Sequence, residues 1–101
     1  MQRTTGRGVG LAFAEKRSAT NSTGQLYTDG RIIYSYGNHW PLAAWIDGKL
    51  HLNDNRYSVT TSKHRSFVIE GLIKAKRYLE LETAVKHSTR AEMQRVCGII
   101  D

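Results

Sequence analysis

The sequence predicts an α+β fold in which an antiparallel β-meander of four to five strands packs against one long helix, with a short C-terminal helix after it. Two Asp-Gly pairs, each between β-branched or aromatic residues, indicate tight hairpins in the first half of the chain. After residue 62 the apolar spacing changes to a helical period. Strands followed by helices are typical of α+β domains. Because 101 residues suffice for one core, we expect a single domain over residues 1–101.

The first 24 residues carry the weakest pattern. Residues 1–8 are rich in Gly, Thr and Arg, which predicts a flexible arm. Apolar residues then alternate with small ones over 9–15 and predict a marginal strand. Segment 16–24 has the Ser, Thr, Asn and Gly content of a loop.

The two Asp-Gly pairs organise the strands that follow. Asp29-Gly30 and Asp47-Gly48 predict type I′ turns, because these residue types tolerate the positive φ that both central positions require. A turn near residue 54 then leads into one more β-rich run. The strands expected from these signals cover residues 25–28, 31–36, 40–46, 49–53 and 56–60.

Two-residue turns also determine which residues face one another across a hairpin. The second turn sets Trp45 opposite Leu50, and this apolar face is expected in the core. The first turn sets Tyr27 opposite Ile32 by the same rule. The remaining face of the second hairpin is mixed in polarity.

Helical signals dominate the second half of the chain. Val68, Leu72 and Leu79 lie on one stripe of a helix expected from Ser62 to Leu79, and Thr61 or Ser62 is placed to cap its first turn. This helix is expected to lie across the sheet.

A short second helix is expected over residues 90–97. Thr89 and Glu92 fit a capping box, and Gly98 is a natural stop. Cys97 is the only cysteine, so it forms no internal disulfide and is expected to pack as a small, buried or half-buried residue.

The charge balance favours a polyanionic partner. A formal net charge of +6 attracts polyanions at low salt, and segment 63–77 holds five basic residues against Glu70 alone. Our leading hypothesis is a non-enzymatic binding module, without cofactor, that contacts nucleic acid or a nucleoprotein complex. Its candidate nucleic-acid-binding residues are Arg56, Lys63, Arg65, Lys74, Lys76 and Arg77.

The aromatic stretch 34–45, "YSYGNHWPLAAW", supports a second hypothesis. Tyr and Trp combine a large apolar body with one polar tip, which suits both the edge of a core and a recognition surface. The alternative function is therefore inhibition of a host-defence protein by protein–protein contact. Its candidate partner-binding residues are Tyr34, Tyr36, Trp40, Leu42, Ile46 and His51.

The four histidines do not form a metal or catalytic signature. None of them has another histidine four residues away, and no HExxH or CxxC motif accompanies them, so no metal site is expected. A small enzyme using His39 or His64 is the third hypothesis; neither has a recognisable carboxylate partner, and we do not expect an enzyme. Segment 60–65 fits either an anion site at a helix start or an ordinary cap with solvated charges.

Three short motifs between residues 18 and 68 resemble a group of small uncharacterised proteins encoded by bacteriophages and related mobile elements. The motifs are a Thr-Asp-Gly turn at 28–30, a Tyr-Gly strand end at 36–37 and a Thr-Thr-x-x-His helix start at 60–64. The resemblance implies a phage context, in which small proteins act by binding nucleic acid or a host machine, anti-CRISPR inhibitors among them, and it implies no site. With no apolar run of about 18 residues and no secretory signal at the start, we expect no membrane association and a location in the cytoplasm of the bacterial host.

Overall fold

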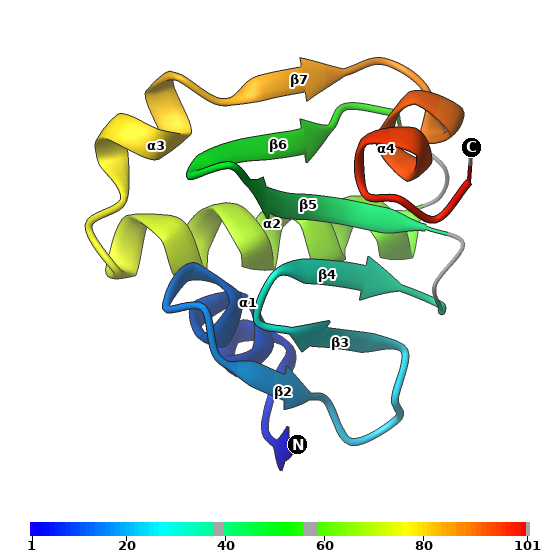
Figure 1. The fold of residues 1–101 in the computed structure, drawn as a ribbon. Helices are drawn as coiled ribbons and strands as arrows, with labels where there is room; N and C mark the ends of the chain where they lie inside the picture. Colours follow the sequence, from blue (N-terminus) through cyan, green and yellow to red (C-terminus); the bar gives the residue numbers. More distant parts are fainter. Residues whose placement is uncertain (38–39, 56–58, 101) are drawn as a thin grey trace.

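The computed structural model describes residues 1–37, 40–55 and 59–100 (Figure 1). Within these ranges a seven-stranded sheet carries its strands in chain order, together with four helices. The strands are β1 (Gln2–Arg3), β2 (Ser18–Thr20), β3 (Leu26–Asp29), β4 (Ile32–Ser35), β5 (Pro41–Ile46), β6 (Lys49–Asn53) and β7 (Val85–His87). The helices are α1 (Gly6–Ala14), α2 (Val59–Lys74), α3 (Tyr78–Glu82) and α4 (Arg90–Val96).

The α+β class is confirmed, but the predicted architecture is wrong. Strands β2 to β6 form an antiparallel meander, whereas β1 pairs parallel with β2 and β7 pairs parallel with β6. The sheet is therefore mixed, with seven strands in place of four to five, and more than one helix packs on it. β1 and β7 are two and three residues long, too short to leave a periodic pattern in the sequence.

The two parallel pairings explain why α1 and α2 share one face of the sheet. The register makes β1 and β6 run in the same direction, and each is followed by a helical crossover to its next neighbour in the sheet. Right-handed crossovers then put both connections on the same face. α1 and α2 lie against each other there, and α4 covers the opposite face (Figure 1).

Segment 9–15, which we expected to be a strand, belongs to helix α1. The Thr5 side chain accepts a hydrogen bond from the Gly8 amide and caps the helix. Val9 and Phe13, four residues apart, face the core on one side of the helix. The apolar residues of this segment alternate with glycine and alanine, which resembles a strand pattern. The Thr5 cap instead stabilises the start of a helix. β2 lies within the segment that we expected to be a loop.

Two glycines allow α1 and α2 to touch through their backbones. A Cβ atom on Gly10 would lie 2.1 Å from the backbone oxygen of Phe67, and one on Gly71 would lie 2.4 Å from the carbonyl carbon of Gly10. Only glycine fits such an approach, and this packing offsets its poor helix propensity.

The predicted register of the second hairpin is confirmed. Asp47 and Gly48 both have positive φ, at 52° and 78°, as a type I′ turn requires. Trp45 faces Leu50, as the turn predicts.

The first hairpin turns one residue later than predicted. Tyr27 faces Tyr34 in place of Ile32, because the carboxylate of Asp29 accepts hydrogen bonds from the amides of Arg31 and Ile32, both at 2.8 Å. Asp29 thus stays in β3, and Gly30-Arg31 forms the tip. The pairing moves by one residue on each strand, which leaves every side chain on its predicted face.

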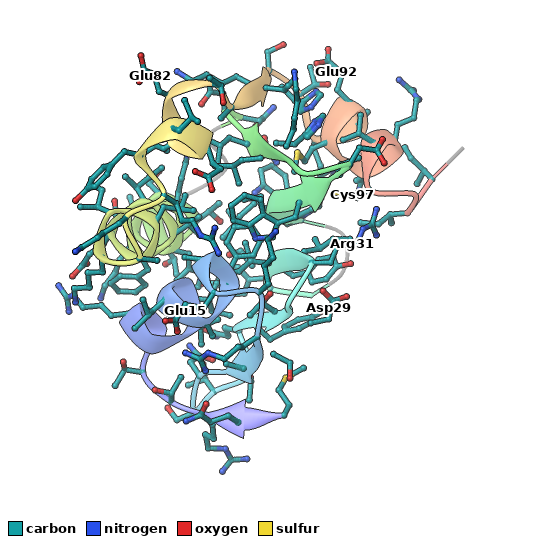
Figure 2. All side chains as sticks on the ribbon, turned by 60° about the vertical axis from the view of Figure 1, so that its left-hand side comes forward. Glu15, Asp29, Arg31, Glu82, Glu92 and Cys97 are labelled. Atoms are coloured by element: carbon teal, nitrogen blue, oxygen red, sulfur yellow. The ribbon has the colours of Figure 1, made fainter. Side chains whose placement is uncertain are left out.

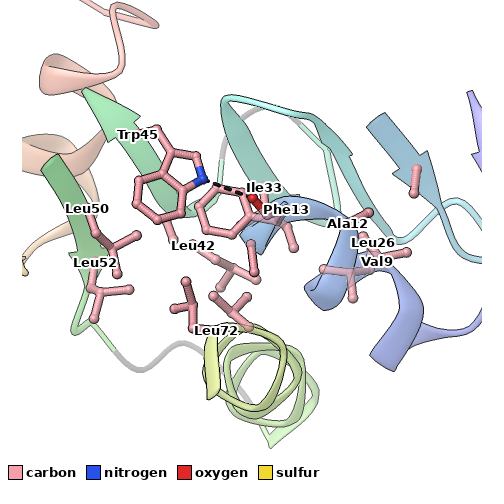
Figure 3. Packing of buried hydrophobic residues seen from close by; sticks show 14 of the residues in the cluster. Val9, Ala12, Phe13, Leu26, Ile33, Leu42, Trp45, Leu50, Leu52 and Leu72 are labelled. Atoms are coloured by element: carbon pink, nitrogen blue, oxygen red, sulfur yellow. Dashed lines mark hydrogen bonds between the residues drawn. The ribbon is translucent and has the colours of Figure 1, made fainter. Parts of the chain in front are cut away.

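The main core lies between the sheet and the α1–α2 layer (Figure 3). The rings of Phe13 and Trp45 stack with centroids 5.5 Å apart, and Trp45 Nε1 donates to the Phe13 carbonyl oxygen at 2.9 Å. The core position predicted for Trp45 is confirmed. Leu42 also packs here, although strict alternation assigned it to the mixed face. The register irregularity between Ile33 and Tyr34 shifts the alternation at the start of β5.

The expected long helix is two helices. α2 begins at Val59, so residues 59–60 of the expected fifth strand are helical, and residues 56–58 lie outside the described ranges. Lys76, with φ 59°, ends α2, and α3 follows. Leu79, which we expected on the apolar stripe, is therefore 69% exposed.

The short C-terminal helix is confirmed. The Thr89 side chain accepts from the Glu92 amide, and Gly98 has φ 78°. Cys97, at the end of α4, is buried, and burial raises the pKa of its thiol to about 11, with Arg31 acting slightly against this (Figure 2). The thiol is a packing group, as expected. No helix in the described ranges has the length and apolar content that crossing a bilayer demands.

Candidate nucleic-acid interface

The basic segment 63–77 does not form the uninterrupted cationic face that its charge count indicates. Three of its five cations lie in ion pairs, and Arg56 lies outside the described residues. Within the described part of the chain, Lys63 and Lys76 form no ion pair; Lys63 lies in the second turn of α2, and Lys76 lies just beyond the end of the helix. The pairs are Arg65 with Asp54 at 2.6 Å, Lys74 with Glu70 at 3.2 Å and Arg77 with Glu80 at 3.3 Å.

Arg77 is mainly a packing residue. Its Nε donates to the carbonyl oxygen of Ala14 at 3.1 Å, and its guanidinium lies 5.8 Å from the ring centroid of Trp45. It ties the start of α3 to the end of α1.

The six candidate partner-binding residues do not share one surface. Tyr34, Trp40 and Leu42 are buried, and Ile46 and His51 are half-buried. Tyr36, by contrast, is 47% exposed. The chain between Tyr36 and Trp40 includes His39, which lies outside the described residues.

The fold brings two of the predicted residues from different hypotheses together. The Tyr36 ring lies 5.8 Å from the His64 ring, which lies 6.3 Å from Phe67. Lys63 Nζ and the Arg7 guanidinium approach the Phe67 ring at 6.0 and 5.3 Å. We call these five residues the aromatic strip. It combines aromatic rings with two cations, the combination with which proteins bind single-stranded nucleic acids.

The backbone holds Tyr36 outward at the end of β4. Tyr36 has φ 62° and Gly37 has φ 106°, so the chain reverses immediately after the strand. The Tyr36 amide donates to the Gln25 carbonyl oxygen at 2.7 Å and fixes this turn. Positive φ is uncommon for an aromatic residue, and here it leaves the ring at the surface.

His64 supports the strip from below. Ser35 Oγ lies 2.8 Å from His64 Nδ1 in a buried hydrogen bond. Burial, with Lys63 adding to it, lowers the pKa of His64, so the ring is neutral at pH 7. Ser35 is fully enclosed, which leaves this Ser–His pair out of reach of a substrate.

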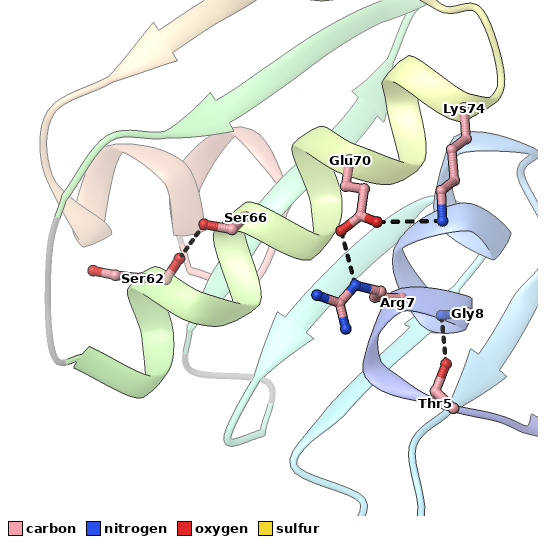
Figure 4. A network of polar contacts seen from close by, with 7 residues as sticks. All are labelled: Thr5, Arg7, Gly8, Ser62, Ser66, Glu70 and Lys74. Carbon is pink, nitrogen blue, oxygen red and sulfur yellow. Dashed lines mark hydrogen bonds and ion pairs between the residues drawn. The ribbon is translucent and has the colours of Figure 1, made fainter.

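Glu70 holds the two cations on the α1 side of α2 (Figure 4). Its carboxylate contacts Arg7 Nε at 3.1 Å and Lys74 Nζ at 3.2 Å. The hydrogen bond from Lys74, followed by Arg7, lowers the pKa of Glu70. All three side chains are more than a third exposed. Surface pairs of this kind are weak, so a phosphate group competes readily for both cations.

A polar cavity of about 500 Å³ opens on the opposite flank of α2, beside β6. Asp54 and Asn55 form one wall, and the first turns of α2 form the other. Arg65 crosses between the walls through its ion pair with Asp54. The cavity and the aromatic strip therefore lie on the two sides of one helix start.

Sequence patterns missed a histidine pair on the α4 side of the sheet. His51 Nδ1 lies 2.9 Å from His87 Nε2, and Glu92 lies 4.0 Å from the other His87 nitrogen. Burial, then His87 and Lys49, lower the pKa of His51. β7 had to be known before His87 could be placed beside His51. The described residues contain no cluster of three ligands suited to a metal ion.

No family model matches the chain, and searches of curated proteins and of solved structures found no significant similarity.

Proposed function

We propose that the protein is a non-enzymatic binding module that contacts single-stranded nucleic acid through the aromatic strip. The observation that carries this proposal is the series of ring contacts from exposed Tyr36 through His64 to Phe67, with the cations of Lys63 and Arg7 beside the Phe67 ring. Bases stack on aromatic rings while cations neutralise the phosphates between them. The excess of six positive charges favours association with any such strand.

The site differs from the one expected from charge alone. Lys63 keeps its predicted role, because it is exposed and adjoins an aromatic ring. Lys74 contributes to binding when its ammonium group leaves Glu70 and pairs with a phosphate of the strand. Lys76 lies beyond the far end of α2 and serves long-range attraction. The resemblance to phage-encoded proteins remains a prediction, and we further propose that the protein acts in the cytoplasm of a bacterial host.

The test is a fluorescence anisotropy titration with a labelled single-stranded oligonucleotide of about ten nucleotides. We expect binding that weakens with salt, with a slope of log K against log salt of about −0.7 per phosphate contacted. Lys63→Gln should make the slope shallower by about 0.7, whereas Lys86→Gln, an exposed lysine on β7, should not.

Tyr36→Ala should weaken binding by about 1–3 kcal/mol through lost stacking. Tyr78→Ala is the matched control, because Tyr78 is also exposed but lies on α3, outside the strip. Absence of binding at low salt, or equal losses in both tyrosine variants, would refute the proposal.

A second candidate function is contact with a protein, such as a host-defence protein. It is favoured by exposed apolar side chains where α2 meets α3, at Ile73, Tyr78 and Leu79. A partner whose binding survives Tyr36→Ala and is lost with Leu79→Glu would support this candidate in place of the first.

A further inference from the structure

The cavity beside β6 has the size of a small-ligand site and a mainly polar lining. Its volume of about 500 Å³ lies within the range of roughly 300–1,000 Å³ usual for such sites. Leu42 is an apolar part of the lining, and the other side chains are polar. Three hydroxyl groups from α2 line one wall, those of Thr61, Ser62 and Ser66.

Arg65 has hydrogen-bonding capacity that the protein does not use. Asp54 Oδ1 holds its Nη2 at 2.6 Å, which fixes the guanidinium at the cavity wall. The Nε atom is buried, and within the described chain it has no hydrogen-bond partner. A buried donor without a partner costs free energy. A ligand acceptor in the cavity that hydrogen-bonds to the Arg65 guanidinium would remove this cost.

The start of α2 adds to the positive character of this wall. α2 has 16 residues and no acidic residue in its first turn, so no side chain there offsets the positive end of its dipole. Ser62 lies on the surface of this turn, and Ser66 donates to the Ser62 carbonyl oxygen at 3.1 Å (Figure 4). The Ser62 hydroxyl and the Arg65 guanidinium on this wall are donors of the kind that phosphate oxygens accept from.

We infer that this cavity binds a phosphate monoester, namely the terminal phosphate of a strand held on the aromatic strip. The inference rests on the proposed function. A monoester offers three strong acceptor oxygens and a charge of about −1.5 to −2, more than a backbone diester presents. Residues 61–66 span only about 8 Å of helix. A strand that crosses the exposed surface of α2 at this level passes Lys63 on one flank and Arg65 on the other.

Asp54 limits the affinity of this site and provides a test of it. Its carboxylate anchors Arg65 from the facing wall, and it also repels a phosphate that enters the cavity. Asp54→Asn removes the charge while its amide oxygen still accepts from Arg65. This variant should bind a terminal phosphate more tightly than the wild type does, which a purely structural role of the ion pair does not predict.

The experiment compares one oligonucleotide with a 5′-phosphate, a 3′-phosphate or two terminal hydroxyls. We expect the wild type to prefer one phosphorylated form by about tenfold, as hydrogen bonds to a charged group allow. Arg65→Lys keeps the charge but loses the fork, and it should abolish the preference while retaining the binding of the hydroxyl form. Arg95→Lys, an exposed arginine on α4, is the matched control and should keep the preference. Thermal melts confirm that each variant is folded.

The possible outcomes separate the two proposals. Equal binding of all three oligonucleotides by the wild type overturns the phosphate site and leaves the strip intact. A preference that survives Arg65→Lys also overturns it. If no oligonucleotide binds, the proposed function fails, and the terminal-phosphate site fails with it.

Discussion

The His64 side chain has three roles: it packs in the core, it contacts the exposed ring of Tyr36, and its titration contributes to the pH dependence of stability. It is 5% exposed, hydrogen-bonded to Ser35 through Nδ1, and in contact with the other two rings of the aromatic strip, those of Tyr36 and Phe67. A neutral imidazole can be buried, form this hydrogen bond and contact both rings. An imidazolium in the same place would be a buried charge beside the charge of Lys63, which is unfavourable. The lowered pKa of His64 is thus a consequence of supporting the strip from within the core.

The folded protein should lose stability on mild acidification. His64 and His51 both have pKa values lowered from the ordinary value of 6.5, so protons bind the unfolded chain more readily. Their contribution is fully present above pH 6.5 and declines as the pH falls below it. Urea unfolding at about pH 7.5 and about pH 5 measures this difference. His64→Gln should show a smaller decline than the wild type, with the remaining part due to His51.

A free energy of unfolding that rises as the pH falls from about 7.5 to about 5 would contradict the conclusion that His64 and His51 are neutral in the folded protein. If His64→Gln declined as steeply as the wild type between the two pH values, His64 would titrate alike in both states.

Some single-residue predictions succeeded because the decisive chemistry is local. Trp45 was placed inside by a two-residue turn whose geometry depends on Asp47 and Gly48 alone. Lys63 and Tyr36 were each named as binding residues, but their proximity depends on His64 and Phe67 lying between them. Such proximity requires the tertiary fold.

At the scale of elements, the contact between α1 and α2 depends on glycines that argue against helix in the sequence. Gly6, Gly8 and Gly10 lower the helix propensity of residues 6–14, and the strand interpretation of 9–15 followed from the alternation of apolar and small residues there. Gly10 and Gly71 are used for close backbone approach, a benefit that exists only once both helices are present. Because residues 1–8 were expected to be a flexible arm, whereas α1 begins at Gly6, Arg7 could not be placed beside α2.

Gly71→Ala should destabilise the protein even though alanine is the better helix former. The new Cβ would lie 2.4 Å from Gly10 backbone atoms, which cannot move aside as a flexible side chain does. Overpacking costs about 1–3 kcal/mol, which exceeds the gain of up to about 1 kcal/mol in helix propensity. Chemical denaturation measures the net loss. Ser66→Ala, on the exposed side of α2, should change the free energy of unfolding by no more than about 0.5 kcal/mol.

Unchanged stability in Gly71→Ala would mean that the two helices separate without cost. In that case Arg7 would not be held beside Phe67, and the cationic part of the strip would lose its structural basis.

On the scale of the whole molecule, the two faces of the sheet are covered very unequally. The α1–α2 layer encloses the main core, whereas α4 covers a smaller cluster of five buried residues. The strands at the two edges, β1 and β7, have only two and three residues. The sequence indicated the meander and the final helix because their turns and caps are local. It did not indicate the parallel edges, which exist only by pairing with distant strands.

This unequal coverage predicts how the molecule opens. α3 has no buried residue and α4 has two, whereas all four residues of β4 are buried. Native-state amide hydrogen exchange should therefore be fastest in α3 and intermediate in α4, and in β4 it should occur only by global unfolding. Adding denaturant should leave the exchange of α3 nearly unchanged while accelerating that of β4. Protection in α3 equal to that in β4 would contradict this order. Because the aromatic strip is built from α1, α2 and the end of β4, this order would also leave it intact while the outer elements open, so nucleic-acid binding should persist under denaturant concentrations that already expose α3.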